Sequence, residues 1–208
     1  MSNARPSRPS LAILATLAHL ASFGCAGEHG SDRAGPPSDD RVAPADCGVP
    51  AGDVQIDEGI GVLRPGTSIE DVRRRCTVVR DTVVPGPEGM SARLLVVQLG
   101  ADSAVGEVVD ETIWRVRLSS GRFRSAQGFG VGTRAREIAA APGAGVHVGE
   151  GEVYMRLEGI CGESYRLAGV DVGRVASAQS AERALEGLPD SARVDRVLLR
   201  RCPQDRGA

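Results

Sequence analysis

The spacing of apolar and polar positions predicts β-strands in several parts of the chain. The segments are residues 91–100, 111–119, 152–158, 163–168 and 192–200. Alternation with a period of two is clearest in residues 111–119 and 152–158, so neighbouring side chains there should point to opposite faces of a sheet. Residues 91–100 and 192–200 contain continuous apolar runs, which are typical of strands with little contact with water.

The two alternating segments divide their side chains into an inward and an outward set. The inward set is Trp114, Val116, Leu118, Val153, Met155 and Leu157. The outward set is Arg115, Arg117, Tyr154 and Arg156. Arg122 and Arg124 continue the run of Arg115 and Arg117 around Phe123, and arginine combined with an aromatic residue is typical of protein interfaces. We expect the four residues of the outward set to form an exposed, protein-binding face.

Helical spacing follows two Gly-Thr pairs. Thr67 stands three residues before Glu70, which predicts a capping box and a helix with residues 69, 72 and 76 on its inner face. Thr133 is expected to cap a second helix, with residues 135, 138 and 139 inward, that ends at Pro142 and Gly143. Residues 180–188 have the pattern of a further short amphipathic helix.

Two segments of the chain resemble each other. Gly59–Val72 and Gly128–Ile138 share Gly-apolar-Gly-Val, then Gly-Thr, then an acidic-apolar pair. Similar segments at fixed positions are the sign of an internal repeat. We predict an α+β fold with two tandem copies, residues 54–120 and 121–202, of a short helix plus antiparallel strands. Its helices should pack on one face of a meander-like sheet.

The first 46 residues have the composition of an export signal followed by a linker. Residues 1–25 combine Arg5 and Arg8, a short apolar run and small residues, which predicts a signal peptide. Gly24 before Cys25 fits the lipoprotein type, in which Cys25 is lipidated; ordinary cleavage after Ala26 is the alternative. Residues 26–46 are rich in Gly, Pro, Ser and Asp, which predicts a flexible tether. A single domain over residues 47–204 and a disordered tail, 205–208, should follow.

The remaining cysteines fit an oxidising compartment. Cys47, Cys76, Cys161 and Cys202 are even in number, and three pairings are possible. We favour Cys47–Cys76 and Cys161–Cys202, because each then closes within one half of the domain. A zinc site is less favoured, since the chain has no Cys-x-x-Cys pair and only His147 within the domain.

Composition excludes several kinds of chemistry. The chain has a net charge of −2 and lacks a basic excess, which argues against a nucleic-acid partner. It has no lysine for Schiff-base chemistry, and His147 alone cannot supply a Ser-His-Asp site. The glycines at 128, 130 and 132 are better explained by turns than by a phosphate-binding loop. We expect no cofactor, no metal and no enzymatic activity.

One enzymatic alternative stays open. Carboxylates that are close in sequence, Glu150 with Glu152 and Asp110 with Glu111, could serve a hydrolase acting on envelope glycan or peptide. This activity would require two carboxyl groups facing each other across a cleft.

The capped Gly-Thr helix followed by antiparallel strands, present twice in an exported chain, resembles the SmpA/OmlA-like and β-lactamase-inhibitor-like families. The similarity covers Gly59–Val72 and Gly128–Ile138. It implies a helix and sheet module that binds proteins in the envelope without catalysis. The expected protein is lipid-anchored, facing the periplasm from the outer membrane, with an envelope protein as its partner; a periplasmic or secreted form is the alternative.

Overall fold

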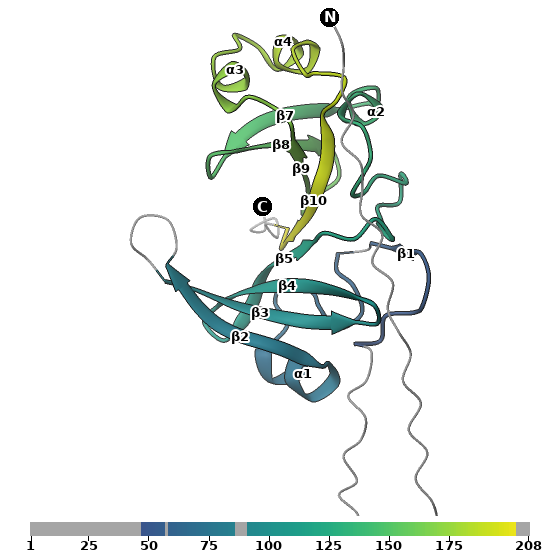
Figure 1. Cartoon of the computed structure of the whole chain (residues 1–208), viewed down its shortest axis with the longest axis vertical. Helices are drawn as coiled ribbons and strands as arrows, with labels where there is room; N and C mark the ends of the chain where they lie inside the picture. The colour runs from purple at the N-terminus through teal and green to yellow at the C-terminus, as the bar shows by residue number, and fades with distance from the viewer. Residues whose placement is uncertain (1–46, 57, 86–90, 203–208) are drawn as a thin grey trace, which may run out of the picture. The chain divides into compact units, whose positions relative to one another are not determined.

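The computed structural model describes residues 47–56, 58–85 and 91–202 (Figure 1). The predicted signal peptide with Cys25, the predicted tether and the C-terminal tail lie outside the described residues. Among the described helices, none has the length and apolar character needed to span a bilayer.

An eight-stranded antiparallel sheet forms the centre of the fold, in the order β2-β3-β4-β5-β10-β9-β8-β7. The first meander consists of β2 (Val78–Pro85), β3 (Ser91–Leu99), β4 (Asp102–Val109) and β5 (Thr112–Leu118). The second consists of β7 (Ala144–Gly149), β8 (Glu152–Leu157), β9 (Glu163–Ala168) and β10 (Arg193–Arg200). Pairing of β5 with β10 joins the two meanders. A short parallel pair, β1 (Val54–Gln55) and β6 (Phe123–Arg124), lies outside this sheet.

The described part of the chain has four short helices beside the sheet: α1 (Ile69–Arg75), α2 (Ala135–Ala139), α3 (Val172–Ala176) and α4 (Ala181–Glu186). Figure 1 shows α1 beside the first meander and α3 and α4 beside the second. Buried residues from all four helices join one apolar cluster with the inward strand residues. The fold is therefore α+β, with helices and core on the same face of a meander sheet.

The predicted helix caps are wrong in detail. Ser68, one residue after Thr67, is the N-cap of α1, and its Oγ accepts a hydrogen bond from the Asp71 N–H at 3.1 Å. The hydroxyl of Thr67 instead donates to the Val62 carbonyl at 3.1 Å. Before α2, the hydroxyl of Thr133 accepts from the Gly130 N–H at 3.0 Å, within the preceding turn. Each threonine stabilises the loop before its helix rather than the helix itself.

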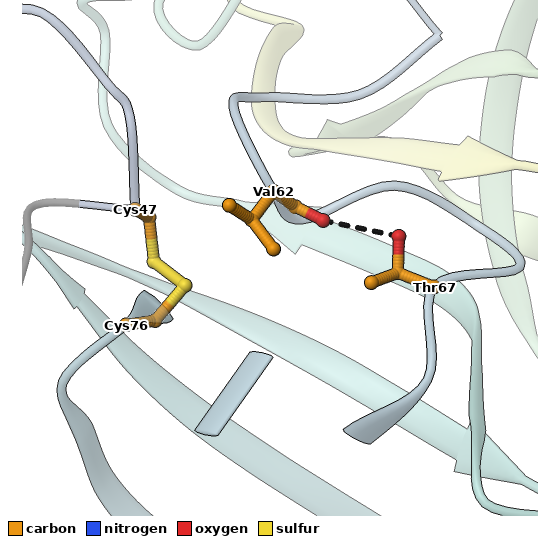
Figure 2. The surroundings of a disulfide bond; sticks show 4 residues. All are labelled: Cys47, Val62, Thr67 and Cys76. Atoms are coloured by element: carbon orange, nitrogen blue, oxygen red, sulfur yellow. Dashed lines mark hydrogen bonds between the residues drawn. A yellow bond between two sulfur atoms is a disulfide. The ribbon is translucent and has the colours of Figure 1, made fainter. Parts of the chain in front are cut away.

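Both predicted disulfides are present. Cys47–Cys76 joins the start of the domain to the end of α1, and Cys161–Cys202 joins the β8–β9 loop to the chain just after β10. Figure 2 shows Val62 next to the first disulfide. The Val62 N–H donates to the Cys47 carbonyl at 2.9 Å. A Cβ on Gly61 would come within 2.1 Å of that carbonyl oxygen, so only glycine permits this close approach.

The loops before α1 and α2 make matching contacts. The Gly66 N–H donates to the Ile113 carbonyl of β5 at 2.5 Å, and the Gly132 N–H donates to the Val194 carbonyl of β10 at 2.8 Å. The same strand residues donate back to the loops. The Ile113 N–H donates to the Thr67 carbonyl at 2.8 Å, and the Val194 N–H donates to the Thr133 carbonyl at 2.9 Å. The last strand of each meander is thus tied to the loop that begins its own half.

The burial of the residues predicted to point inward agrees with the alternation, except at Trp114. Val116, Leu118, Val153, Met155 and Leu157 are all buried in the core. Trp114 is 39 % exposed. The pairing of β4 with β5 shifts register after Glu107, so Trp114 has no partner and forms a β-bulge. The bulge moves Trp114 to the face opposite the core.

Candidate functional site

The face of the sheet opposite the core is rich in arginine, and we call it the arginine face. Directly opposed residues in antiparallel strands lie on the same face. The pairing register therefore places one row of side chains across it, from β8 to β2. In order, the row is Arg156, Ser164, Leu198, Arg117, Val105, Val96 and Arg80. Trp114, Arg115, Tyr154, Arg166, Arg196 and Arg200 flank this row on the same face.

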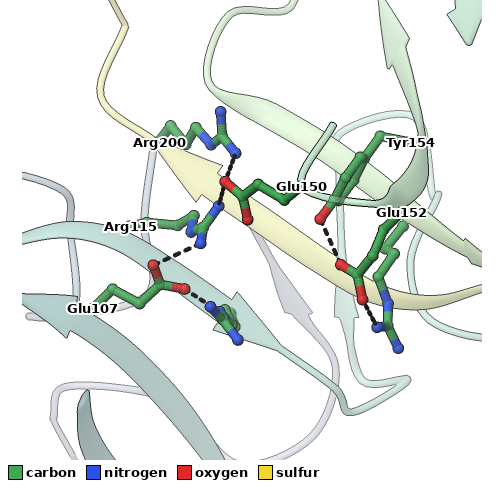
Figure 3. Close-up of polar contacts among 8 residues, drawn as sticks. Glu107, Arg115, Glu150, Glu152, Tyr154 and Arg200 are labelled. Carbon is green, nitrogen blue, oxygen red and sulfur yellow. Dashed lines mark hydrogen bonds and ion pairs between the residues drawn. The ribbon is translucent and has the colours of Figure 1, made fainter. Parts of the chain in front are cut away.

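A buried ion-pair network lies at the centre of the arginine face (Figure 3). Arg115 and Glu107 are 4 % and 5 % exposed, and their side chains pair at 2.6 Å. Arg117 also pairs with Glu107. Arg115 donates to Glu150 at 2.7 Å, and Arg200 contacts the same Glu150 oxygen at 3.3 Å. Because Glu150 lies in the β7–β8 turn, this turn is held over β10 and β5.

A second polar cluster lies beside the first. The Tyr154 hydroxyl donates to Glu152 at 2.6 Å, and Arg166 pairs with both Glu152 and Asp195. Burial and the hydrogen bond to Glu152 raise the pKa of Tyr154 to about 12. The His147 ring stacks on Tyr154 with centroids 5.6 Å apart. His147 is thus half-buried rather than exposed. Its pKa is lowered by burial and by the nearby Arg156 and Arg200.

Trp114 is the aromatic residue that the arginine face presents to solvent. The guanidinium carbons of Arg115 and Arg200 lie 5.1 and 5.5 Å from its ring centroid, within range of cation–π attraction. The sequence pattern placed Trp114 in the core, so it was missed as a surface residue. A strict period of two cannot show where a bulge interrupts it.

The four residues predicted to form an exposed face do share one face, but they are not equally exposed. Arg156 is exposed and its Nε donates to the Ser164 hydroxyl at 3.0 Å. Arg117 is partly buried against Glu107. The expected exposure of Arg115 and Tyr154 is wrong, since both are buried. The Glu150 turn covers Arg115, and the hydroxyl of Tyr154 is directed to Glu152 rather than to water.

Positive charge exceeds negative charge on this face. The carboxylates that pair with its arginines are Glu107, Glu150, Glu152 and Asp195. In the described part of the chain, Arg156 and Arg196 have no carboxylate within salt-bridge distance. Burial lowers the pKa of Arg196, and the positive charges of Arg166 and Arg117 lower it further. The arrangement therefore favours an anionic ligand.

Glu150 and Glu152, two of the carboxylates considered for catalysis, each accept hydrogen bonds from neighbouring side chains. The hydrogen bond from Arg115 lowers the pKa of Glu150. Burial alone would raise the pKa of Glu152, but hydrogen bonds from Tyr154 and Arg166 lower it. Both groups are therefore ionised at neutral pH, whereas a glycosidase general acid must hold a proton. Asp110 and Glu111 occupy the exposed β4–β5 turn.

A pocket of about 230 Å³ lies beside the Cys161–Cys202 disulfide, and Arg200 of the arginine network is among the residues that line it. Its lining includes Arg64, Glu58 and Glu163. Across residues 47–56, 58–85 and 91–202, no group of three or more His, Cys, Asp or Glu side chains is placed to hold a metal ion.

Comparison with known proteins gives a fold and no function. No protein-family model matches the chain, and no curated protein matches it significantly. The fold is similar to that in the crystal structure of the uncharacterized protein yfeY from Escherichia coli, with a TM-score of 0.53 and 19 % identity. The match covers 71 % of this chain and 100 % of that chain. At this identity the similarity supports a shared fold alone.

Proposed function

We propose that this chain is an exported envelope protein that binds another protein through its arginine face and catalyses no reaction. The observation that carries the proposal is Trp114, an exposed aromatic side chain held between arginines on the sheet face opposite the helices and core. Tryptophan and arginine are the residues most enriched in the energetic centres of interfaces. Arg115 and Tyr154 act as buried supports in this proposal, and Arg117 and Arg156 as contact residues.

The proposed location is the cell envelope, with the chain anchored through lipid on Cys25. Two disulfides are compatible with an oxidising, extracytoplasmic compartment. The proposed anchor is tested by fractionating cells that express the chain with Cys25→Ser. We expect the wild-type protein in the membrane fraction and the variant in the soluble periplasmic fraction. A variant that stays in the membrane fraction would contradict lipidation at Cys25.

We further propose that the two halves of the domain are tandem copies of one unit. The matching bonds of Gly66 and Gly132 support this, as does a bulge near the start of β5 and of β10. Gly61 and Gly130 support it too, because a Cβ at either position would meet a backbone carbonyl oxygen at 2.1 or 2.3 Å. Homologues in which one half occurs alone would be the decisive observation.

The binding function is tested by capture from envelope extract. The bait is a soluble form without the signal peptide and Cys25, residues 26–208, with both disulfides formed. Trp114→Ala together with Arg156→Ala should abolish retention of a partner with little change in melting temperature, because both side chains lie at the surface. The matched control is Val83→Ala, which truncates a side chain that is 63 % exposed in β2 and lies on the opposite face. Equal capture by both variants would refute this assignment.

The alternative function, a hydrolase acting through carboxylates, has one observation in its favour. Glu58 and Glu163 both line the pocket beside the Cys161–Cys202 disulfide. If this pocket were catalytic, Glu163→Gln would abolish hydrolysis of envelope glycan or peptide by the wild-type chain. Absence of any hydrolysis by the wild-type chain would remove this alternative.

A further inference from the structure

Resting on the proposed binding function, we infer that the arginine face binds an extended acidic segment of its partner, in which carboxylates alternate with apolar side chains. The segment lies across the strands, along the row from Arg156 to Arg80. The inference follows from the order of side chains in that row, from their spacing and from the charge that the domain leaves uncompensated.

Arginines recur along the row, and partly exposed valines lie between two of them, whereas Ser164 and Leu198 in the other interval are buried. Arg156, Arg117 and Arg80 are separated first by Ser164 and Leu198 and then by Val105 and Val96. The two valines are partly exposed and are absent from the apolar cluster on the other face. A row of arginines alone would bind any polyanion. Valines between arginines instead favour a ligand that carries apolar groups between its negative charges.

The spacing matches an extended peptide. Arg156 and Arg117 are three strands apart, and so are Arg117 and Arg80. Strands are spaced about 4.8 Å apart, so each interval is about 14 Å. A peptide in β conformation advances about 3.3 Å per residue, so side chains four residues apart are about 13 Å from each other and point the same way. The fitting sequence therefore has an acidic residue at every fourth position, with an apolar residue midway between the two acidic residues that meet Arg117 and Arg80.

The charge balance supports an acidic occupant. Arg156 donates only to the Ser164 hydroxyl, and exposed Arg80 has no carboxylate within salt-bridge distance among the described residues. Arg117 shares Glu107 with buried Arg115. Each arginine of the row thus retains donors for a carboxylate of the partner. A membrane headgroup or a glycan would satisfy the arginines but leave the valines uncovered.

The chain carries its own reporter for this interaction. Trp114 is the single tryptophan and lies on the arginine face. The probe is the synthetic peptide Glu-Ser-Leu-Thr-Glu-Ser-Leu-Thr-Glu, blocked at both ends and titrated into residues 26–208 with both disulfides formed. We expect saturable quenching or a wavelength shift of Trp114 fluorescence. A peptide of the same composition with its three glutamates adjacent should bind at least about fivefold more weakly, since it cannot satisfy the arginines together.

Variants test the row directly. Arg156→Ala and Arg80→Ala should each weaken peptide binding about threefold to fivefold, as expected for exposed ion pairs. Because the two sites are far apart, their effects should multiply to about tenfold or more in the double variant. Val105→Thr, which keeps shape and removes apolar contact, should also weaken binding. The control is Arg174→Ala, an exposed arginine of α3 on the helical side, which should leave binding unchanged.

The outcomes separate this inference from the proposed function. No binding of the spaced peptide, or equal binding of the clustered one, overturns the inference. Capture of an envelope protein that Arg80→Ala and Arg156→Ala do not weaken overturns the inference but keeps the protein-binding function. Self-association that is lost in the same variants would make a second copy of the chain the occupant, and would also overturn it. Peptide binding without any captured partner would contradict the proposed function alone.

Discussion

Removing the carboxylate of Glu107 should destabilise the domain more than any exposed charge substitution. Glu107 is 5 % exposed and pairs with Arg115 and Arg117. Breaking a buried pair by changing one partner costs about 3–5 kcal/mol, because the other charge stays buried. Arg115 retains Glu150, whose side chain is 40 % exposed, so we take the lower end, about 3 kcal/mol. For a domain of this size, that corresponds to a melting temperature lower by about 6–12 °C.

The assay is thermal unfolding of Glu107→Gln, followed by circular dichroism with the disulfides intact. Glu111→Gln is the matched control, because it removes the same charge from an exposed ion pair. Glu111 pairs with Arg93, and the Glu111 side chain is 70 % exposed. An exposed pair contributes about 0–1 kcal/mol, so the control should melt within about 2–4 °C of wild type. If the two variants melt together, the buried network is not a stabilising element and the reasoning fails. Replacing Glu107 and Arg115 together by methionine should recover much of the lost stability.

Three further predictions concern the Cys47–Cys76 disulfide, Gly61 and the pH dependence of stability. Replacing Cys47 and Cys76 by serine removes a link across 29 residues, and denaturant titration should show a loss of about 3.5 kcal/mol; an unchanged free energy of unfolding would contradict this. Gly61→Ala should cost about 2 kcal/mol or more, through its clash with a carbonyl oxygen and its φ of +53°, whereas Gly145→Ala, which meets open space, should melt close to wild type. The pKa of Glu152 is lowered from its usual 4.5 in the folded state, so the ionised Glu152 stabilises the fold above pH 4.5. This stabilisation is lost as the pH falls further. The melting temperature of Glu152→Gln should therefore drop less steeply on acidification than that of the wild type.

Much of the fold follows from local patterns in the sequence. Residues 112–118 and 152–157 alternate strongly enough that their strands and most of their inward residues were predictable, and the apolar run in residues 91–99 predicted a further strand. The strands β2, β4 and β7 were not predicted. In β4 the obstacle is Gly106, which is typical of a turn but lies within the strand, where a Cβ would meet the Ile113 Cδ1 at 2.7 Å. Contacts of this kind arise only after two strands have paired, so no single segment reveals them.

The sequence predicted which residues of the candidate site share a face of the sheet, but not which of them are exposed. Alternation places Arg115 and Tyr154 together on the side opposite the core, and that grouping agrees with the register. Their burial depends on the Glu150 turn, which lies 35 residues from Arg115 in sequence. The exposure of Trp114 depends on a bulge, which changes no residue type in its own segment. Non-local contacts and backbone irregularities therefore decide which predicted residues a partner can touch.

The placement of the disulfides bears on how the chain reaches its native state. Cys47–Cys76 and Cys161–Cys202 each lie within one half, and each meander pairs strands that are consecutive in sequence. Local pairing forms quickly because short loops cost little entropy to close. Under the proposed export, the first half can therefore form its disulfide correctly while the second half is still crossing the membrane, without a wrong partner from the later cysteines. Pairing of β5 with β10 is then the long-range step that completes folding.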